Sequence, residues 1–290
     1  MNIIGHQKNI QSFIRLKSED KIPHALLLTG PLGIGKKKVA WHFAQSLLCT
    51  EASPPCESCS ACLKVQQRQH PDFIFIEPEE DVIKIDSIRH LKSQLSLQPF
   101  EAKFKIALIA DAEAMNVAAS NALLKTLEEP SEKTLLFLTS SAPYRLLKTI
   151  LSRCQKMYFS PLRPEEIQSI LVGRSIPVSS LLKEVESPGI LLSIDEAALV
   201  LFEEKMLPSL QSHPKDLMTL LKSAEEISDE DSMQKTILYL LKKHWHRKIL
   251  ASPLPSEVKK IEAIEQAEKF LKMNANPLLT FENLFIQLCL

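Results

Sequence analysis

The first 160 residues alternate between short apolar runs and longer segments whose apolar residues recur every three or four positions. The short runs predict buried strands and the longer segments predict helices that pack on them. We expect strands at 25–29, 72–76, 104–110, 135–139 and 155–159, and helices at 36–48, from a cap at Asp86, and from Asn116 or Ser120 to the residue before Pro130. Strands separated by helices in this way are typical of a parallel sheet covered on both faces.

The strand pattern ends near Ser160, and the remaining residues show only helical periodicity. Pro164 suits the first turn of a helix that runs through Leu171. Further helices are expected at 178–185, 190–202, 214–227, 231–250, 256–274 and 281–290. The sequence therefore predicts three domains, an α/β domain at 1–160, a small helical domain at 161–203 and an all-helical domain at 204–290. The last carries no recognisable chemistry and reads as a packing or assembly module.

Composition narrows the class of protein. The chain has 290 residues, 45% of them hydrophobic, and a formal net charge of zero. The first two values fit a folded protein of two or three domains, and the zero charge gives no overall drive toward DNA or an anionic membrane. No apolar run approaches the roughly 20 residues needed to cross a bilayer, and the N-terminus lacks the pattern of a secretion signal. We expect a cytoplasmic protein, in which disulfides are disfavoured.

A glycine-rich loop follows the first predicted strand. Gly30, Gly33 and Gly35 are three of only six glycines in the chain, and Lys36 follows them. The spacing fits the phosphate-binding pattern G-x-x-x-x-G-K-[ST], except that Lys37 replaces the hydroxyl residue that holds Mg²⁺. Lysine offers no acceptor to a cation. Two interpretations stay open: a loop that binds ATP or ADP phosphates without metal, with the Lys37 ammonium near the missing Mg²⁺, or an empty loop kept for packing.

Four cysteines lie close together in the sequence. Cys49, Cys56, Cys59 and Cys62 have the spacing C-x6-C-x2-C-x2-C, which suits a structural Zn²⁺ with four sulfur ligands. Four unrelated thiols and an iron–sulfur cluster are the alternatives, and the cluster is disfavoured because Cys62 is not followed by proline. Four sulfur ligands leave no position for water, so catalytic zinc is not expected.

An ATPase with a phosphate-binding loop also needs two acidic residues at the end of a second strand, one to orient Mg²⁺ and one to polarise the attacking water. The strand at 105–109 is followed by Ala110-Asp111-Ala112-Glu113, which contains no adjacent pair. Taken alone, this segment would allow Asp111 to be the magnesium carboxylate.

Two motifs carry a family resemblance. The segment Ser120-Asn121-Ala122-Leu123-Leu124-Lys125-Thr126-Leu127-Glu128-Glu129-Pro130 and the triplet Ser152-Arg153-Cys154 are very similar to those of bacterial DNA polymerase III clamp-loader subunits. The cysteine cluster after the glycine loop resembles the same family. These features span residues 24–154, and they resemble the delta-prime group more than the ATPase subunits.

The resemblance implies a damaged ATPase site. It aligns Ala110 with the magnesium aspartate and Asp111 with the catalytic glutamate. Gly189-Ile190-Leu191-Leu192 stands where ATPase members have G-x-x-R, so an arginine that would reach the γ-phosphate is missing. Together with Lys37, these departures predict that the chain does not hydrolyse ATP.

The resemblance also implies a role for Arg153. In the family the arginine of the S-R-C motif reaches across a subunit interface to a neighbour's ATP, and a guanidinium is suited to phosphate oxygens. An internal salt bridge is the alternative for Arg153. The implied architecture is a RecA-like AAA+ domain with an inserted zinc module at 49–62, then a helical lid and a helical collar domain.

The implied function is that of a rigid end-member of the clamp loader. Its partners would be the ATPase subunits and the delta subunit, and the assembly would place a sliding clamp on primer–template DNA. Two other functions stay open: an active AAA+ ATPase that uses Asp111 for metal, and a zinc-dependent DNA-binding module. Among the remaining motifs, Glu128-Glu129-Pro130 is expected to be a helix end, Thr139 a packing residue, and His244-Trp245-His246 a core and surface segment.

Overall fold

The computed structural model describes residues 3–131, 133–172, 189, 195–211, 216–251 and 254–289. The chain divides into two compact units, residues 1–191 and 192–290. The helix predicted at 178–185 lies outside the described residues, as does the start of the one predicted at 190–202.

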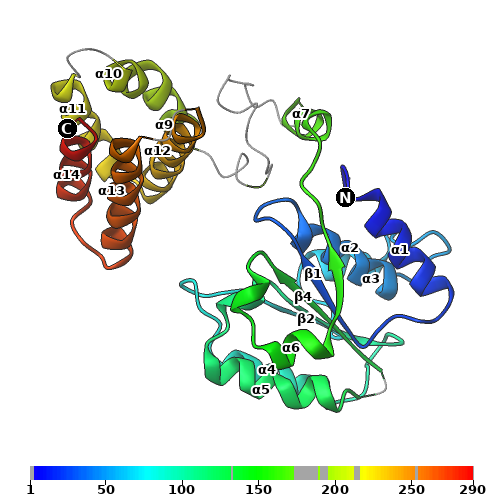
Figure 1. Ribbon diagram of the computed structural model, residues 1–290. Coiled ribbons are helices and arrows are strands. Elements are labelled where there is room, and N and C mark those ends of the chain that lie inside the picture. Colours follow the sequence, from blue (N-terminus) through cyan, green and yellow to red (C-terminus); the bar gives the residue numbers. More distant parts are fainter. Residues whose placement is uncertain are drawn as a thin grey trace. The chain divides into compact units, whose positions relative to one another are not determined.

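The first unit is built on a five-stranded sheet whose paired strands are all parallel, in the order β2-β3-β4-β1-β5 (Figure 1). The strands are β1 (Ala25–Thr29), β2 (Phe73–Ile76), β3 (Lys105–Ile109), β4 (Thr134–Ser140) and β5 (Gln155–Tyr158). Strand β1 lies between β4 and β5 and is buried along its whole length, and Leu27 is paired with Leu138 on one side and Lys156 on the other. The predicted α/β domain with a parallel sheet is confirmed.

Helices cover both faces of this sheet, as Figure 1 shows. The helices are α1 (Gln7–Ser18), α2 (Lys36–Leu48), α3 (Ser60–Gln66), α4 (Ile85–Leu95), α5 (Val117–Glu128) and α6 (Lys148–Arg153). Alternate residues of β1 point to opposite faces, so Leu27 joins the core under α4, α5 and α6, whereas Leu26 and Leu28 join the core under α1, α2 and α3. Phe13 of α1 stacks on Phe43 of α2 with ring centroids 3.8 Å apart.

Several helix limits differ from expectation. Helices α1 and α3 are not among the predicted helices. Ile10, Phe13 and Ile14 of α1 do recur at helical spacing, whereas α3 has only 7 residues. Helix α4 begins at Ile85 after Lys84, so Asp86 lies in the first turn and is not the cap. Asn116, one of the two expected starts, caps α5 by accepting the Ala119 N–H at 2.8 Å.

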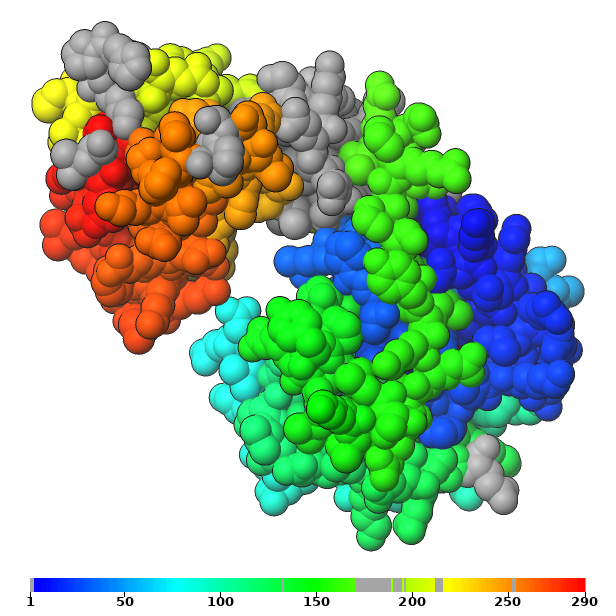
Figure 2. All heavy atoms as spheres, viewed as in Figure 1, coloured from blue at the N-terminus to red at the C-terminus, as the bar shows by residue number. Residues whose placement is uncertain are grey.

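The N-terminal residues pack beside the chain that leaves the sheet. The side chain of Asn9 donates to the Tyr158 carbonyl at 2.8 Å. In Figure 2 the blue N-terminal atoms lie next to the light-green atoms of this later segment. Helix α7 (Pro164–Val172) follows, with Pro164 in the expected first position.

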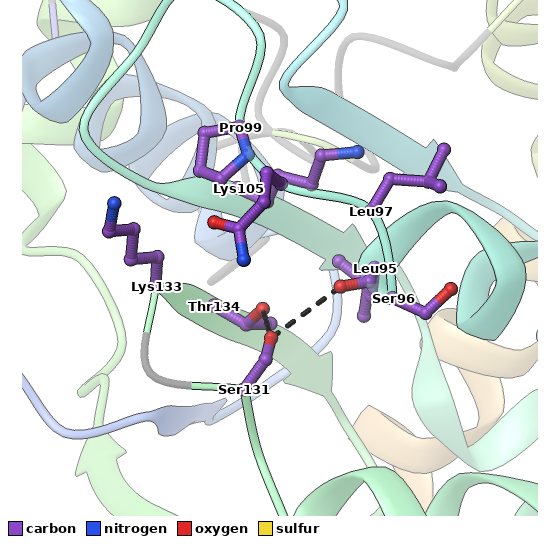
Figure 3. Close-up of a pocket in the computed structure, with 9 residues that line it drawn as sticks. Leu95, Ser96, Leu97, Pro99, Lys105, Ser131, Lys133 and Thr134 are labelled. Atoms are coloured by element: carbon purple, nitrogen blue, oxygen red, sulfur yellow. Dashed lines mark hydrogen bonds between the residues drawn. The ribbon is translucent and has the colours of Figure 1, made fainter.

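A hollow of about 320 Å³ opens at the amino ends of β3 and β4 (Figure 3). The Lys105 ammonium donates to the Gln94 carbonyl at 2.7 Å, and so satisfies one of the unpaired carbonyls at the end of α4. The hydroxyls of Ser131 and Thr134 contact each other on the same wall. These contacts tie α4 to the sheet.

The second unit is helical in the described residues. It contains α9 (Glu196–Leu201), a π-helical turn at Phe202–Met206, α10 (Leu207–Gln211), α11 (Leu217–Ser228), α12 (Asp231–Ala251), α13 (Pro255–Lys272) and α14 (Pro277–Cys289). Its core includes Trp245, Phe202 and Phe285. His244 is buried and His246 is exposed, which confirms the division between core and surface expected for this motif.

Asp72 is a buried carboxylate that fixes the loop before β3. Its oxygens accept the backbone N–H groups of Phe100, Glu101 and Ala102 at 2.7–2.8 Å. Burial alone would raise the pKa of Asp72, but the three donors outweigh it and the pKa lies below its usual value.

Replacing Asp72 should therefore destabilise the first unit in a pH-dependent way. We expect Asp72→Asn to lower the free energy of unfolding by about 2–4 kcal/mol at neutral pH, because the donors lose a charged acceptor. A lowered folded-state pKa gives stability that is present above the unfolded pKa of about 3.9 and is lost as the pH falls through the folded value. Hydrogen exchange of the β2 and β3 amides should show this difference at pH 7 and a much smaller one in acid. The exposed Asp86→Asn should show neither effect.

Candidate functional site

The glycine loop has a backbone that requires glycine. Gly33 and Gly35 have φ values of 74° and 97°, and Gly30 has a φ of 154°. A Cβ on Gly30 would lie 2.3 Å from the Phe159 carbonyl oxygen. The loop between β1 and α2 therefore needs glycine at these positions.

The lysine of this loop is bound to the loop itself. Lys36 is buried, and its ammonium donates to the carbonyls of Gly30 at 2.8 Å and Pro31 at 2.6 Å. Burial lowers the pKa of Lys36, and the nearby carboxylates of Asp111 and Glu113 oppose that shift. Two donors of the group expected to hold a phosphate are used internally.

Gly189, far from the glycine loop in the sequence, contacts the backbone of this loop. Its N–H donates to the Gly33 carbonyl at 2.7 Å, and a Cβ at this position would lie 2.5 Å from that oxygen. Only glycine fits such a close approach. Gly189 is the first residue of the segment compared above with G-x-x-R, and it lies against the loop. Ile190, Leu191 and Leu192 lie outside the described residues.

Lys37 points to a surface ion pair. Its ammonium lies 3.3 Å from Glu77, whose other oxygen is 2.7 Å from Arg68. The Arg68 guanidinium in turn stacks 4.5 Å from the Phe75 ring centroid. The sequence did not predict these partners, which lie some 30 to 40 positions from Lys37. Lys37 therefore shares the carboxylate of Glu77 with Arg68.

The residues after β3 form hydrogen bonds with the segment at the end of β4. Ala110 is fully buried. The Asp111 N–H donates to the Thr139 hydroxyl at 3.0 Å, and burial, followed by the charge of Glu113, raises the pKa of Asp111. Glu113 accepts from the Ser141 N–H at 2.7 Å and hydroxyl at 2.6 Å. Asp111 and Glu113 are separated by Ala112, so no two adjacent residues after β3 are both acidic.

The four predicted cysteines converge. Their Sγ atoms all lie within 4.8 Å of one another, and Cys49 and Cys59 are 3.9 Å apart. Tetrahedral Zn²⁺ with Zn–S bonds of about 2.3 Å separates its sulfurs by about 3.8 Å, so the thiols fit this ion. Backbone N–H groups donate to two of the sulfurs, from Cys59 to Cys56 at 3.3 Å and from Cys62 to Cys59 at 3.4 Å. Of the residues that the structure describes, only these four form a group of three or more possible metal ligands.

The cysteine segment is joined to the core of the first unit. Cys62 is buried in α3, and the amide of the fully buried Gln45 in α2 donates to its carbonyl at 3.2 Å. The Lys17 ammonium of α1 donates to the Ser46 carbonyl nearby. A metal held by the four thiols would therefore fix α3 against α1 and α2.

Arg153 ends α6 at the surface. One terminal nitrogen lies 2.7 Å from a Glu128 oxygen, and the other donates to the Thr149 carbonyl at 3.0 Å. The Arg153 side chain is one third exposed. The adjacent Cys154 is buried, and burial raises the pKa of its thiol to about 11, so the thiol stays neutral. Arg153 does form the internal salt bridge considered as its alternative role, with a partner that was not predicted.

Comparison with known proteins identifies the family. A family model described as "DNA polymerase III, delta subunit" matches residues 5–163, more than half of the chain. The chain belongs to this family, among the delta-prime subunits of the clamp loader. A DNA polymerase III subunit delta-prime of Pseudomonas aeruginosa is 47% identical over 135 residues, which are 45% of this chain and 41% of that protein. One of Bacillus subtilis is 38% identical over 159 residues, or 54% and 48% of the two chains.

The fold has a counterpart among solved structures. This chain is similar to a DNA polymerase III gamma subunit-related protein of Thermotoga maritima. The superposition covers 94% of this chain and 97% of that chain, with a TM-score of 0.56 and 20% sequence identity. This similarity supports the fold described above, a parallel α/β domain followed by a helical C-terminal part. The chain spans about half the length of the curated relatives it matches. Among the described residues, no helix has the length and apolar character to span a membrane.

Proposed function

We propose that this chain is a subunit of the DNA polymerase III clamp loader that does not hydrolyse ATP and lends Arg153 to the ATP of a neighbouring subunit. The observation that carries the first half is the internal use of Lys36, whose ammonium is bound by two carbonyls of its own loop. Family membership and the position of Arg153 at the exposed end of α6 support the second half.

Three further features support the absence of hydrolysis. Lys37 is paired with Glu77, Ala110 has no ligand to offer, and Gly189 is bonded to the loop. Together they favour the proposed subunit over an active ATPase that uses Asp111 for metal.

The neighbour's site would gain charge stabilisation from Arg153. A guanidinium supplied in trans stabilises the negative charge that spreads over the transferred phosphoryl group. The energy for opening a sliding clamp and placing it on primer–template DNA then comes from the ATPase subunits, and this chain and the delta subunit complete the ring. We place this assembly in the cytoplasm, and we assign a lid to 161–203 and a collar to 204–290.

Zn²⁺ is the cofactor that the four thiols fit best. It would be held by Cys49, Cys56, Cys59 and Cys62, and it would supply four bonds that cross-link the segment 49–62. This is a structural role, and we assign no step of ATP chemistry to the metal.

The isolated chain should fail to bind nucleotide through its loop. We expect calorimetry with millimolar MgATP or MgADP to give no saturable heat, because phosphates would have to displace the internal contacts of Lys36 and Gly33. Lys36→Ala should give the same flat titration. Saturable binding that Lys36→Ala abolishes, or steady ATP turnover by the isolated chain, would overturn the first half of the proposal.

A further inference from the structure

The guanidinium of Arg153 has both of its terminal nitrogens occupied within its own domain. Nη2 lies 2.7 Å from Glu128, and Nη1 lies 3.0 Å from the Thr149 carbonyl and 3.4 Å from the Ser152 hydroxyl. These are the two nitrogens that a guanidinium uses to bind a phosphate in a forked arrangement. With these contacts in place, the Arg153 guanidinium cannot bind the phosphates of another molecule through both terminal nitrogens.

We propose that Glu128 is a positioning residue that holds Arg153 in a resting position until the neighbour's nucleotide displaces it. The inference rests on the proposed function of Arg153 in trans. Glu128 is the last residue of α5 and Arg153 is the last residue of α6, and their ion pair joins the C-terminal ends of the two helices. The contact joins the two family motifs, and its two residues are 25 positions apart in the sequence.

The exposure of this pair makes it suited to exchange. The side chains of Arg153 and Glu128 are 33% and 48% exposed, and ion pairs at such exposure are weak. An ATP γ-phosphate offers more negative charge and several oxygens in a geometry that matches the guanidinium. The phosphate can therefore replace the carboxylate at small cost, whereas without a neighbour the carboxylate keeps the side chain ordered against α6.

The adjacent residue provides a matched control. Glu129 is exposed, and it forms no ion pair or side-chain hydrogen bond with any described residue. Glu129→Gln removes the same charge as Glu128→Gln, one position away, without touching Arg153. A general change in the charge of this surface would act equally through both variants.

The test is ATP turnover by the clamp loader assembled with its own ATPase subunits. We expect Glu128→Gln to lower the KM for ATP about two- to fivefold with kcat unchanged, as expected for loss of a weak competing pair. Glu129→Gln should leave both constants unchanged, and Glu128→Gln should have no effect when Arg153 is already alanine.

Other outcomes distinguish a failure of the resting position from a failure of the proposed function of Arg153. If Arg153→Ala lowers turnover but Glu128→Gln equals wild type or equals Glu129→Gln, the resting position is wrong and the proposed function stands. A fall in kcat with Glu128→Gln would also overturn it, because Glu128 would then hold Arg153 in its working position. If Arg153→Ala leaves turnover intact, the proposed function fails and this inference fails with it.

Discussion

Arg153→Ala should lower ATP turnover by the assembled clamp loader by a factor of about 10³–10⁵ at the interface it serves, the range that an arginine supplied in trans is worth. The side chain ends α6, and its guanidinium is held by Glu128 and Thr149 at the surface of the domain. Removing it would leave the developing phosphoryl charge without this donor. Single-turnover hydrolysis measures the loss without a contribution from product release.

Arg153→Lys is the matched variant for this prediction. Lysine keeps the positive charge but loses the planar fork, so it should recover only a small part of the rate. The pair with Glu128 is exposed and weak, so Arg153→Ala should leave the stability of the free chain nearly unchanged. Equal turnover by wild type and both variants would reduce Arg153 to the structural role of its salt bridge.

Cys59→Ser should remove the metal and loosen the segment 49–62. We expect wild-type protein to contain one zinc per chain by elemental analysis, and the variant to contain almost none, because serine replaces a thiolate ligand. We expect the free energy of unfolding of the first unit to fall by more than about 3 kcal/mol, as for other losses of a structural metal. Faster hydrogen exchange should be centred on α3 and on the α2 residues around Gln45, which donates to Cys62.

Cys289→Ser is the control for zinc content, because Cys289 lies in the second unit outside the cluster. It should retain the metal. Zinc-free wild-type protein with unchanged stability, or a Cys59→Ser variant that keeps its zinc, would contradict the structural role assigned to the four thiols.

Local patterns in the sequence were sufficient for much of the fold. The five strands lie where the apolar runs predict them, and the Asn116 cap follows from a residue type that accepts the free N–H groups of a helix. The cysteine spacing likewise predicted four sulfurs in one place. In each case the relevant residues are close in sequence, so one short segment contains the whole signal.

The contacts of the site that the sequence did not predict join residues far apart in the sequence. Lys37 pairs with Glu77, Gly189 bonds to Gly33, and Arg153 pairs with Glu128. Each joins two segments that only the folded chain brings together, and the motifs do not say which of their residues meet. The family motifs marked Arg153 and its neighbourhood, but they do not say where the guanidinium rests.

The central claim is that the glycine loop takes no part in ATP hydrolysis whereas Arg153 acts on a neighbour's ATP. Two variants in one assay test it most directly. Steady-state ATP turnover would be measured for the assembled clamp loader that carries either Lys36→Ala or Arg153→Ala in this chain. Our account predicts that Lys36→Ala leaves turnover unchanged, because that lysine is bound to its own loop, and that Arg153→Ala removes the turnover that depends on its interface. Turnover that is lost with Lys36→Ala and kept with Arg153→Ala would contradict it.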